Sequence, residues 1–294
     1  MVDLSWFVGA TEYSLSDRNP YYSLGHKGFG MPPIRRLEER GPLQDGVTDR
    51  GYRYDPRVII LSLGIKGDDQ ADFYSKRSSL INIFKARNTA GKLRFVVGSI
   101  TRQIDGHLVG NALAFDDDNR DRLFQRVGIA IKCPDPRWYD PSMQTVTFEL
   151  GGGDDTLVVP YEVPYKLGAS TIDVSKTITY AGNIKSYPTI RITGPIENAI
   201  ITHNTTGYVL DFTGTTIAAD DYYEIDLGYS DNTIVDSAGT NKIDDLTDDS
   251  DLVEWAIEAS PEVAGGVNSI NVSGSGVDAD TKVDVTYYDM YTGI

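Results

Sequence analysis

Side chains that commonly carry out chemistry are few in this sequence. There are three histidines, His26, His107 and His203, and a single cysteine, Cys133. No histidine has another histidine or a cysteine at metal-site spacing, and no G-x-S-x-G segment presents a serine nucleophile. A Ser-His-Asp set remains an alternative, because its members can lie far apart in sequence. We expect solvated loop histidines, and we predict no enzyme activity, no metal site and no cofactor.

Two acidic segments have the composition of cation-binding loops. Residues 115–122 place Asp117, Asn119 and Asp121 at the first, third and fifth positions of an EF-hand loop. The glycine expected at the sixth position and the glutamate expected at the twelfth are both missing from this segment. Residues 244–251 are acidic without any recognised pattern. We interpret both segments as charged loops first and as ion sites second.

Charge is divided unevenly along the chain. Residues 1–140 hold 21 Lys and Arg against 18 Asp and Glu, whereas residues 141–294 hold 6 against 25. This asymmetry predicts two domains, residues 1–142 and 143–294, and it disfavours binding of nucleic acid or anionic membranes by the second. No apolar run approaches the roughly 20 residues of a membrane span, and no signal peptide is recognisable. One cysteine excludes an internal disulfide framework, so we expect synthesis in a reducing cytoplasm.

Apolar periodicity predicts one helix among strands in the first half, an α+β unit. Residues 57–65 are apolar at nearly every position, which indicates a strand covered on both faces. A helix is expected to begin at Asp68 or Asp69, either of which can cap it, and to end before Gly91. Residues at steps of three and four should form one face of this helix, namely Phe73, Arg77, Leu80, Ile81 and Phe84.

The strand pattern continues to the end of the first half. Asp105-Gly106 is predicted to be the turn of a hairpin. Alternation along residues 123–133 predicts a half-buried strand with Cys133 as a buried, inert thiol. The prolines that follow cannot continue a strand, so a domain should end there. The predicted interdomain linker comprises Pro136, Trp138, Tyr139 and Pro141.

The second half reads as short strands separated by Gly, Asp and Asn, which predicts a β-sandwich. The whole chain is therefore expected to be mainly β. Three tyrosines cluster near the end of the sequence, Tyr287, Tyr288 and Tyr291. Packing within the sheets and an exposed ligand or partner surface are equally favoured for them.

The order of these features resembles the distal tail proteins of siphovirus-type bacteriophages, which form the hub of the tail-tip baseplate. The resemblance covers most of the chain and rests on GFGMPPIRRLEERGPLQDG, YDPRVIILSLGIKG, FYSKRSSLINIFKARNTAGKLRFVV, QRVGIAIKCPDPRWYDP, YPTIRITGPIENAIITHNTTGYVLDF and GVNSINVSG. It implies an N-terminal split β-barrel with one helix, six copies of which close into a ring, and a C-terminal galectin-like β-sandwich. Trp138 and Tyr139 are then expected to anchor the exit from the ring-forming domain.

The same resemblance implies a structural protein of the virion, located at the tail tip. The implied partners are further copies of itself, the tail tube protein, the tail-tip hub protein and receptor-binding proteins at the periphery. DNA is implied only as cargo passing through the ring channel, and no membrane is involved. The alternative function is a carbohydrate-binding adhesin that uses the C-terminal sandwich.

A long loop or extended arm is predicted at residues 25–50, before the apolar strand that contains Ile60. Ring closure would cover the second face of that strand, and Arg is favoured at protein interfaces. We therefore hypothesise that arm and strand contact a neighbouring subunit, and the alternative is a solvated loop. The candidate interface residues are Arg35, Arg36, Glu38, Glu39, Arg40 and Ile60.

Overall fold

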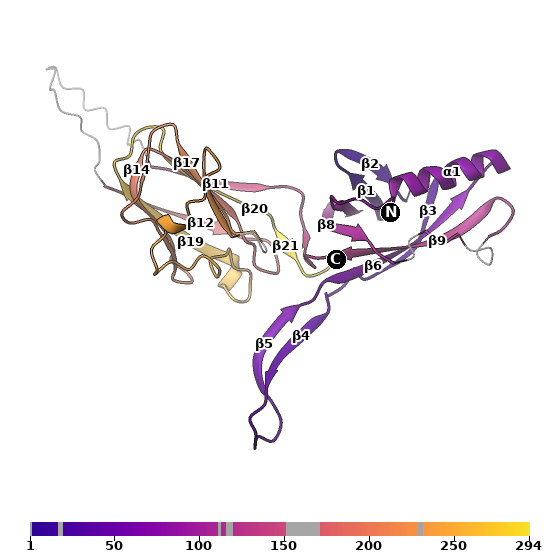
Figure 1. Cartoon of the computed structure of the whole chain (residues 1–294), viewed down its shortest axis with the longest axis horizontal. Helices are drawn as coiled ribbons and strands as arrows, with labels where there is room; N and C mark the ends of the chain where they lie inside the picture. The colour runs from indigo at the N-terminus through magenta and orange to yellow at the C-terminus, as the bar shows by residue number, and fades with distance from the viewer. Residues whose placement is uncertain (1, 17–19, 111–112, 116–119, 151–170, 229–231) are drawn as a thin grey trace. The chain divides into compact units, whose positions relative to one another are not determined.

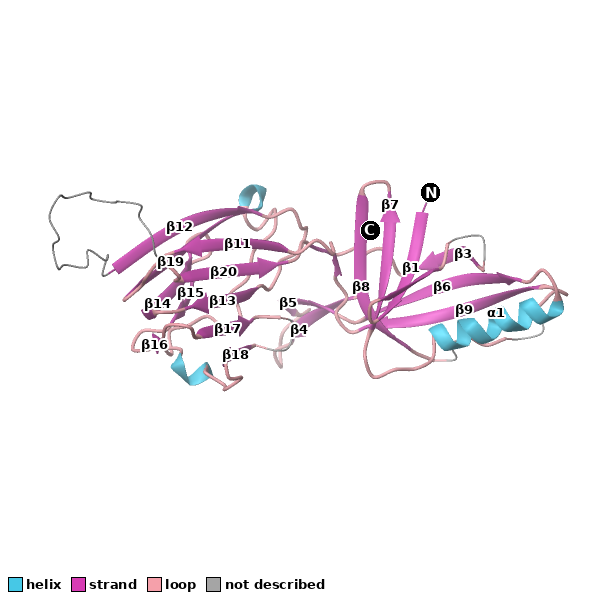
Figure 2. Ribbon diagram, turned by 90° about the horizontal axis from the view of Figure 1, so that it is seen from above, coloured by secondary structure: helices cyan, strands magenta, loops and turns pink. Residues whose placement is uncertain are grey.

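The computed structural model describes residues 2–16, 20–110, 113–115, 120–150, 171–228 and 232–294. The described residues are mainly β-strand with one α-helix, which confirms the predicted class (Figures 1 and 2). The chain divides into two compact units. Unit 1 comprises Met1–Pro141 together with Tyr291–Ile294, and unit 2 comprises Ser142–Met290. The last four residues thus group with unit 1, whereas the sequence assigned them to the second domain.

Unit 1 is built on a sheet with the strand order β2-β1-β7-β8-β9-β6-β3, in which neighbours are antiparallel. The strand β8 connects β7 to β9 in this sheet, because its first seven residues pair with β7 and its last two residues pair with β9. In the described part of this sheet, β2 and β3 are the two edge strands. They do not pair with each other, so the described strands do not close into a barrel. The strands are β1 (Val2–Val8), β2 (Thr11–Ser14), β3 (Tyr21–Lys27), β6 (Arg57–Lys66), β7 (Gly91–Val97), β8 (Ile100–Leu108), β9 (Phe124–Cys133), β10 (Trp138–Tyr139) and, at the unit boundary, β21 (Met290–Tyr291).

The helix α1 (Gln70–Ile83) begins directly after Asp69, one of the two predicted cap residues. The Asp69 carboxylate accepts a hydrogen bond from the Asp72 amide at 2.8 Å, which satisfies a free donor of the first turn. Beyond the other end, the Arg87 guanidinium donates to the carbonyl oxygens of Asn82 and Ile83, each at 2.8 Å. These contacts stabilise the negative end of the helix dipole.

The buried face of α1 differs from the prediction at one position. Phe73, Leu80 and Ile83 face the core, but Ile81 is 47% exposed. At 100° per residue, Ile81 and Ile83 lie on opposite flanks of the line through Phe73 and Leu80, and the core is on the flank of Ile83. The predicted stripe was therefore too wide.

The hairpin turn predicted at Asp105-Gly106 was wrong, because both residues lie inside β8. The β7–β8 turn is Gly98-Ser99, where Gly98 adopts φ 60°, a conformation that glycine permits. Gly106 is needed in the strand because a Cβ there would lie 2.6 Å from the side chain of Ile131. Close packing between strands, not a turn, explains this glycine.

The arm is a β-hairpin rather than a loop. Its strands are β4 (Ile34–Glu39) and β5 (Thr48–Tyr54), paired with a register shift between Arg36 and Glu38. These two strands form a separate sheet and are largely exposed along their length (Figure 1). Without a buried face the sequence shows no apolar alternation, which is why the pattern indicated no strands.

Unit 2 is a sandwich of two antiparallel five-stranded sheets, as the short-strand pattern predicts. Alternate residues of both sheets contribute to one apolar core. One sheet has the order β11 (Gln144–Glu149), β20 (Lys282–Tyr287), β13 (Thr189–Thr193), β17 (Tyr222–Asp226) and β18 (Thr233–Asp236). The other has the order β12 (Thr171–Thr179), β19 (Val267–Ser275), β14 (Ile196–His203) and β15 (Tyr208–Asp211), with β16 (Thr216–Ile217) paired to β14. Short 3-10 turns occur at Ile243–Asp245 and Ala264–Gly266.

Candidate interaction surfaces

The strand β6 has one buried and one exposed apolar face. Its odd-numbered residues from Ile59 to Ile65 are fully buried, on the side where α1 contributes Phe73 and Leu80 to the core. On the other side Val58 is 46% exposed and Ile60 is 43% exposed. Within the described residues, the cover that was predicted for both faces of β6 is thus present on one face only.

The exposed side of β6 continues onto its neighbouring strands. Ile60 pairs with half-buried Ala130 of β9, and the side chain of Leu24 from β3 would contact a Cβ at Gly64, on the same side. Leu24, Val58, Ile60 and Ala130 together form a surface that we call the outer face of β6. Exposed β-branched and leucine side chains grouped in this way are typical of an interaction surface.

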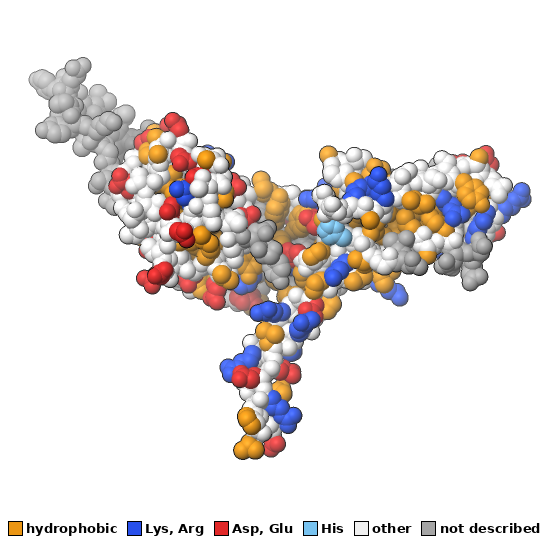
Figure 3. All heavy atoms as spheres, viewed as in Figure 1, with side chains coloured by type: hydrophobic (Ala, Val, Ile, Leu, Met, Phe, Trp, Pro, Cys, Tyr) orange, Lys and Arg blue, Asp and Glu red, His pale blue; other side chains and the backbone are white. Residues whose placement is uncertain are grey.

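The arm carries exposed ion pairs across its two strands. Arg36 contacts Asp49 at 3.1 Å and Arg50 contacts Glu39 at 2.6 Å, while Arg35 contacts Asp55 at 3.2 Å. Figure 3 shows basic and acidic side chains interspersed along it.

Solvent screens such exposed pairs, so each stabilises the hairpin by less than about 1 kcal/mol. Two further candidate residues, Glu38 and Arg40, are exposed, and Arg40 donates to the Gln44 carbonyl at 3.3 Å.

The base of the arm is held by a buried arginine that sequence reasoning did not single out. Arg57 is 2% exposed, and its guanidinium donates to the carbonyl oxygens of Gly28 at 3.2 Å, Gly30 at 2.8 Å and Thr292 at 2.5 Å. The amide of Ile294 also donates to the Phe29 carbonyl at 3.1 Å. Arg57 thereby ties the arm and the last residues of the chain to β6. No local pattern identifies it, because its partners are distant in sequence.

The predicted linker residues belong largely to the interior of unit 1. Trp138 is fully buried and meets Phe29 edge to face at 5.2 Å, while Pro136 is also buried. The Tyr139 hydroxyl donates to the Asp105 carboxylate at 2.8 Å. Pro141 is the residue after which the unit boundary falls.

The three late tyrosines do not form a common surface. Tyr287 lies in the core of unit 2, near the ring of Tyr180, and Tyr288 is partly exposed. Tyr291 belongs to unit 1, where the Arg102 guanidinium lies 3.5 Å from the centre of its ring. Tyr287 is therefore not available to an exposed aromatic surface.

The expectation of solvated loop histidines was wrong for His203, which is fully buried at the end of β14. Its Nδ1 accepts from the Thr206 amide at 3.2 Å, and its Nε2 lies 3.0 Å from the Asn268 Oδ1. These partners select the neutral ring with the proton on Nε2. Burial lowers the pKa of His203, although the Asn268 hydrogen bond partly opposes this. The other two histidines lie in strands, with His26 exposed and His107 half-buried.

We expect His203 to make unit 2 less stable in mild acid. Because the folded pKa is below the unfolded value of about 6.5, the unfolded chain binds a proton first as the pH falls. The free energy of unfolding of unit 2 is unaffected by His203 at pH values well above about 6.5. It decreases as the pH falls below that value, by at most about 1.4 kcal/mol per pH unit. Urea unfolding at about pH 7.5 and pH 5.5 should show a larger loss in the wild type than in His203→Gln, which does not titrate. Equal losses in both proteins would contradict this expectation.

Ion binding and membrane spans can be assessed only in the described part of the chain. Among the described residues no three His, Cys, Asp or Glu side chains are arranged to hold a metal ion. Asp117 and Asn119 lie outside the described residues, as do residues 151–170. The helix in the described part of the chain is neither long nor apolar enough to cross a membrane. Cys133 is buried as predicted, and burial raises the pKa of its thiol to about 12.

Comparison with known proteins relates unit 1 to one protein family. Residues 10–135 match the family described as phage tail protein RIFT-related domain. This part of the chain is therefore similar to phage tail domains of the RIFT-related type. A search of curated protein sequences finds no match.

Solved structures extend the likeness to the whole chain. The fold is similar to that of the Dit protein of phage SPP1, with a TM-score of 0.64 and 14% identity over 99% of both chains. That protein is described as a paradigm of the hub adsorption apparatus in phages that infect Gram-positive bacteria. A chain of the phage P2 baseplate matches with a TM-score of 0.48 and 10% identity over 97% of this chain and 98% of the other. The resemblance to distal tail proteins is therefore confirmed by two findings, the match of residues 10–135 to a phage tail family and the similarity of the fold to that of SPP1 Dit.

Proposed function

We propose that this protein is the structural hub of a long, non-contractile phage tail tip. In this proposal six copies form a ring through unit 1, and DNA passes through its channel as cargo. The ring joins the tail tube protein to the tail-tip hub protein. Unit 2, as the galectin-like domain, carries receptor-binding proteins at the periphery. The phage tail domain at residues 10–135 and the fold shared with SPP1 Dit support this role.

The observation that carries the proposal is the outer face of β6. Val58 and Ile60 lie on a strand whose other face is already filled by the core, so the chain itself leaves them exposed to water. Burial of apolar surface is favourable by roughly 25 cal/mol per Å². A closed ring lets every copy cover this face with a neighbour and leaves no unpaired end.

The arm is the second element proposed to contact a neighbouring copy. Its strands are exposed on both sides, and Leu43 at the tip is fully exposed. Its weak ion pairs can be exchanged for pairs with another chain at little cost. Among the described residues the adhesin alternative has no comparable observation in its favour, because Tyr287 is buried in the core of unit 2.

We expect Ile60→Asp to disrupt the ring. A carboxylate placed in an apolar interface loses hydration without gaining a partner, and about 3 kcal/mol per interface raises the assembly concentration more than about 100-fold. Light scattering after size exclusion should give about six 32.3 kDa chains for the wild type and fewer for the variant. Negative-stain images of the same peaks show whether rings are present.

Ile81→Asp provides the matched control, since Ile81 on α1 is 47% exposed but lies away from the outer face of β6. Rings that persist in Ile81→Asp and vanish in Ile60→Asp support the proposal. Rings of unchanged mass in Ile60→Asp would refute the role of this face, and a wild type that stays a single chain at high concentration would refute self-assembly.

A further inference from the structure

Basic side chains lie on the same side of the sheet as the outer face of β6. In the antiparallel register Lys27 of β3 is the partner of Ile60, and Lys132 of β9 is the partner of Val58. Register partners point to the same side of a sheet, and alternation along the strands adds two further cations. We call these four residues the basic rim, namely Lys27, Lys66, Arg126 and Lys132.

The basic rim is not neutralised within the described part of the chain. All four side chains are exposed, and none has a hydrogen-bond or ion-pair partner among the described residues. The strands β3, β6 and β9 contain no Asp or Glu, although the whole chain has 43 acidic residues against 27 Lys and Arg. The outer face of β6 therefore fits a partner surface that is apolar and negatively charged.

The arm has two sides of different composition. The Arg36 guanidinium lies 5.7 Å from the centre of the Tyr52 ring and 3.1 Å from the Asp49 carboxylate. The ring of Tyr52 also meets that of Tyr54 edge to face at 5.4 Å, so these side chains share one side. Alternation and the strand register add two more residues to it. We call this side the tyrosine face of the arm, and it comprises Ile34, Arg36, Glu38, Asp49, Tyr52 and Tyr54.

The tyrosine face combines exposed apolar groups with net negative charge. Ile34 is 46% exposed and Tyr52 is 51% exposed. The two carboxylates, Glu38 and Asp49, are direct cross-strand partners, and like charges in that position destabilise a hairpin. Arg36 pairs with Asp49 alone, and Glu38 has no side-chain partner among the described residues. A cation from another chain would relieve this repulsion.

The opposite side of the arm is basic. Arg35 and Arg53 are cross-strand partners there. Arg35 is paired with Asp55 and Arg50 with Glu39, whereas Arg53 has no such partner within the described residues. The basic rim would repel this side of the arm, so only the tyrosine face complements the outer face of β6.

The arm and the outer face of β6 also agree in length. At about 3.3 Å per residue, β5 spans roughly 20 Å, and β6 from Val58 to Lys66 spans roughly 26 Å. A two-stranded hairpin is only marginally stable in water unless it packs against another surface. Docking on β6 of another copy would give the arm the buried face that it lacks.

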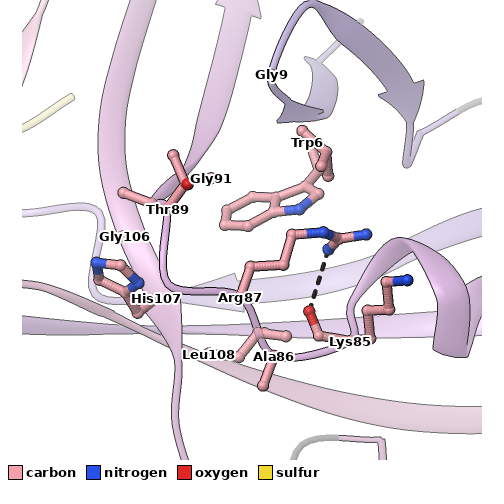
Figure 4. A pocket seen from close by; sticks show the side chains of 12 residues that line it. Trp6, Gly9, Lys85, Ala86, Arg87, Thr89, Gly91, Gly106, His107 and Leu108 are labelled. Atoms are coloured by element: carbon pink, nitrogen blue, oxygen red, sulfur yellow. Dashed lines mark hydrogen bonds between the residues drawn. The ribbon is translucent and has the colours of Figure 1, made fainter.

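A pocket beside Trp6 is another candidate seat for the arm. It lies between the segment after α1 and the end of β8, and its volume is about 60 Å³ (Figure 4). A cavity that accepts one benzene molecule has a volume of roughly 150 Å³. The pocket is therefore too small for the ring of Tyr52, whereas the outer face of β6 is open.

We propose that the tyrosine face of the arm of one copy docks on the outer face of β6 of the next copy, with Glu38 against the basic rim. This inference rests on the proposed ring and names the two surfaces that meet in it. Because these surfaces are different parts of the chain, the contact is heterologous, which is the kind that closes into a ring. Docking buries exposed apolar groups of both surfaces and brings opposite charges together.

Disulfide cross-linking tests which side of the arm meets β6. The natural Cys133 is buried, so introduced cysteines determine which disulfides form. Two copies with different tags are expressed together, one with Tyr52→Cys and the other with Ile60→Cys, and are oxidised with diamide. We expect a mixed dimer on a non-reducing gel. Arg53→Cys in place of Tyr52→Cys is the matched control, and we expect it to give little mixed dimer because residue 53 points to the opposite side of the arm.

Charge reversal tests the role of the basic rim. Glu38→Lys is expected to raise the concentration needed for ring assembly about tenfold, and so are Lys27→Glu and Lys132→Glu. Glu38→Lys combined with the reversed lysine that lies opposite it should restore assembly, since the pair is exchanged and not lost. Light scattering after size exclusion measures each assembly. Failure of both combinations to improve on Glu38→Lys alone would overturn the assignment of Glu38 to the basic rim.

The outcomes separate this docking from the ring itself. Rings that give no mixed dimer from Tyr52→Cys with Ile60→Cys would overturn the docking while the proposed function stands. Equal amounts of mixed dimer from Arg53→Cys and Tyr52→Cys would also overturn it. A wild type that stays a single chain at high concentration would overturn the proposed ring, and the docking with it.

Discussion

Arg57→Met is expected to lower the free energy of unfolding of unit 1 by about 3 kcal/mol and to release both the arm and the last residues of the chain. The Arg57 guanidinium is the shared donor for the carbonyl oxygens of Gly28, Gly30 and Thr292. Methionine retains the packing of the aliphatic stem but leaves these part-buried acceptors without the guanidinium donor, at about 1 kcal/mol each.

Hydrogen exchange measured by mass spectrometry shows which segments of the chain lose protection in Arg57→Met. Faster exchange is expected in residues 28–34 and 290–294, where the partners of Arg57 lie. Arg126→Met is the matched control, because Arg126 is exposed on the adjacent strand β9. Unchanged exchange in both segments of Arg57→Met would show that the arm base is held by other contacts.

Asn268→Ala is expected to destabilise unit 2 by about 3 kcal/mol. Asn268 is fully buried at the start of β19. Its Oδ1 faces the His203 Nε2 at 3.0 Å and accepts from the Glu258 amide at 2.9 Å. Its Nδ2 donates to the carbonyl oxygens of Glu258 and Gly266, each at 2.9 Å.

Removal of this one amide leaves the His203 ring and the Glu258 backbone without their buried partners. Urea unfolding monitored by circular dichroism, with exchange of unit 2 peptides, measures the loss. Asn271→Ala, three residues further along β19, provides the control because its amide contacts Asp173 and Ser175 at the surface. We expect Asn271→Ala to lower the free energy of unfolding by less than about 1 kcal/mol. Similar losses in the two variants would mean that the buried hydrogen bonds of Asn268 contribute no more to the stability of unit 2 than the surface contacts of Asn271.

Local patterns were sufficient for several elements. Period-two alternation identified β9 and ended it at Cys133, before the prolines. The cap residue Asp69 located the start of α1, and short strands separated by turn residues indicated the sandwich. Each of these depends on backbone geometry or on side chains within a few positions, so the sequence carries the information directly.

The candidate surfaces depended on contacts that no local pattern contains. Ile60 was identified as an interface candidate, but the apolar run could not show which face of β6 the core fills. Glu38 and Arg40 were placed in a loop that is in fact part of a hairpin without a buried face. The pocket at Trp6 joins segments that pair only in the folded chain.

The sequence by itself determined the mainly β class, the single helix with its cap, and the resemblance to phage distal tail proteins. Tertiary structure alone decided that Arg57 is buried with partners as far away as Thr292, that His203 is enclosed with Asn268, and that Asp105-Gly106 lies within a strand. The physical reason is the range of the interactions. Periodicity and capping act over a few residues, whereas burial and hydrogen-bond pairing are set by segments that meet only when the chain has folded.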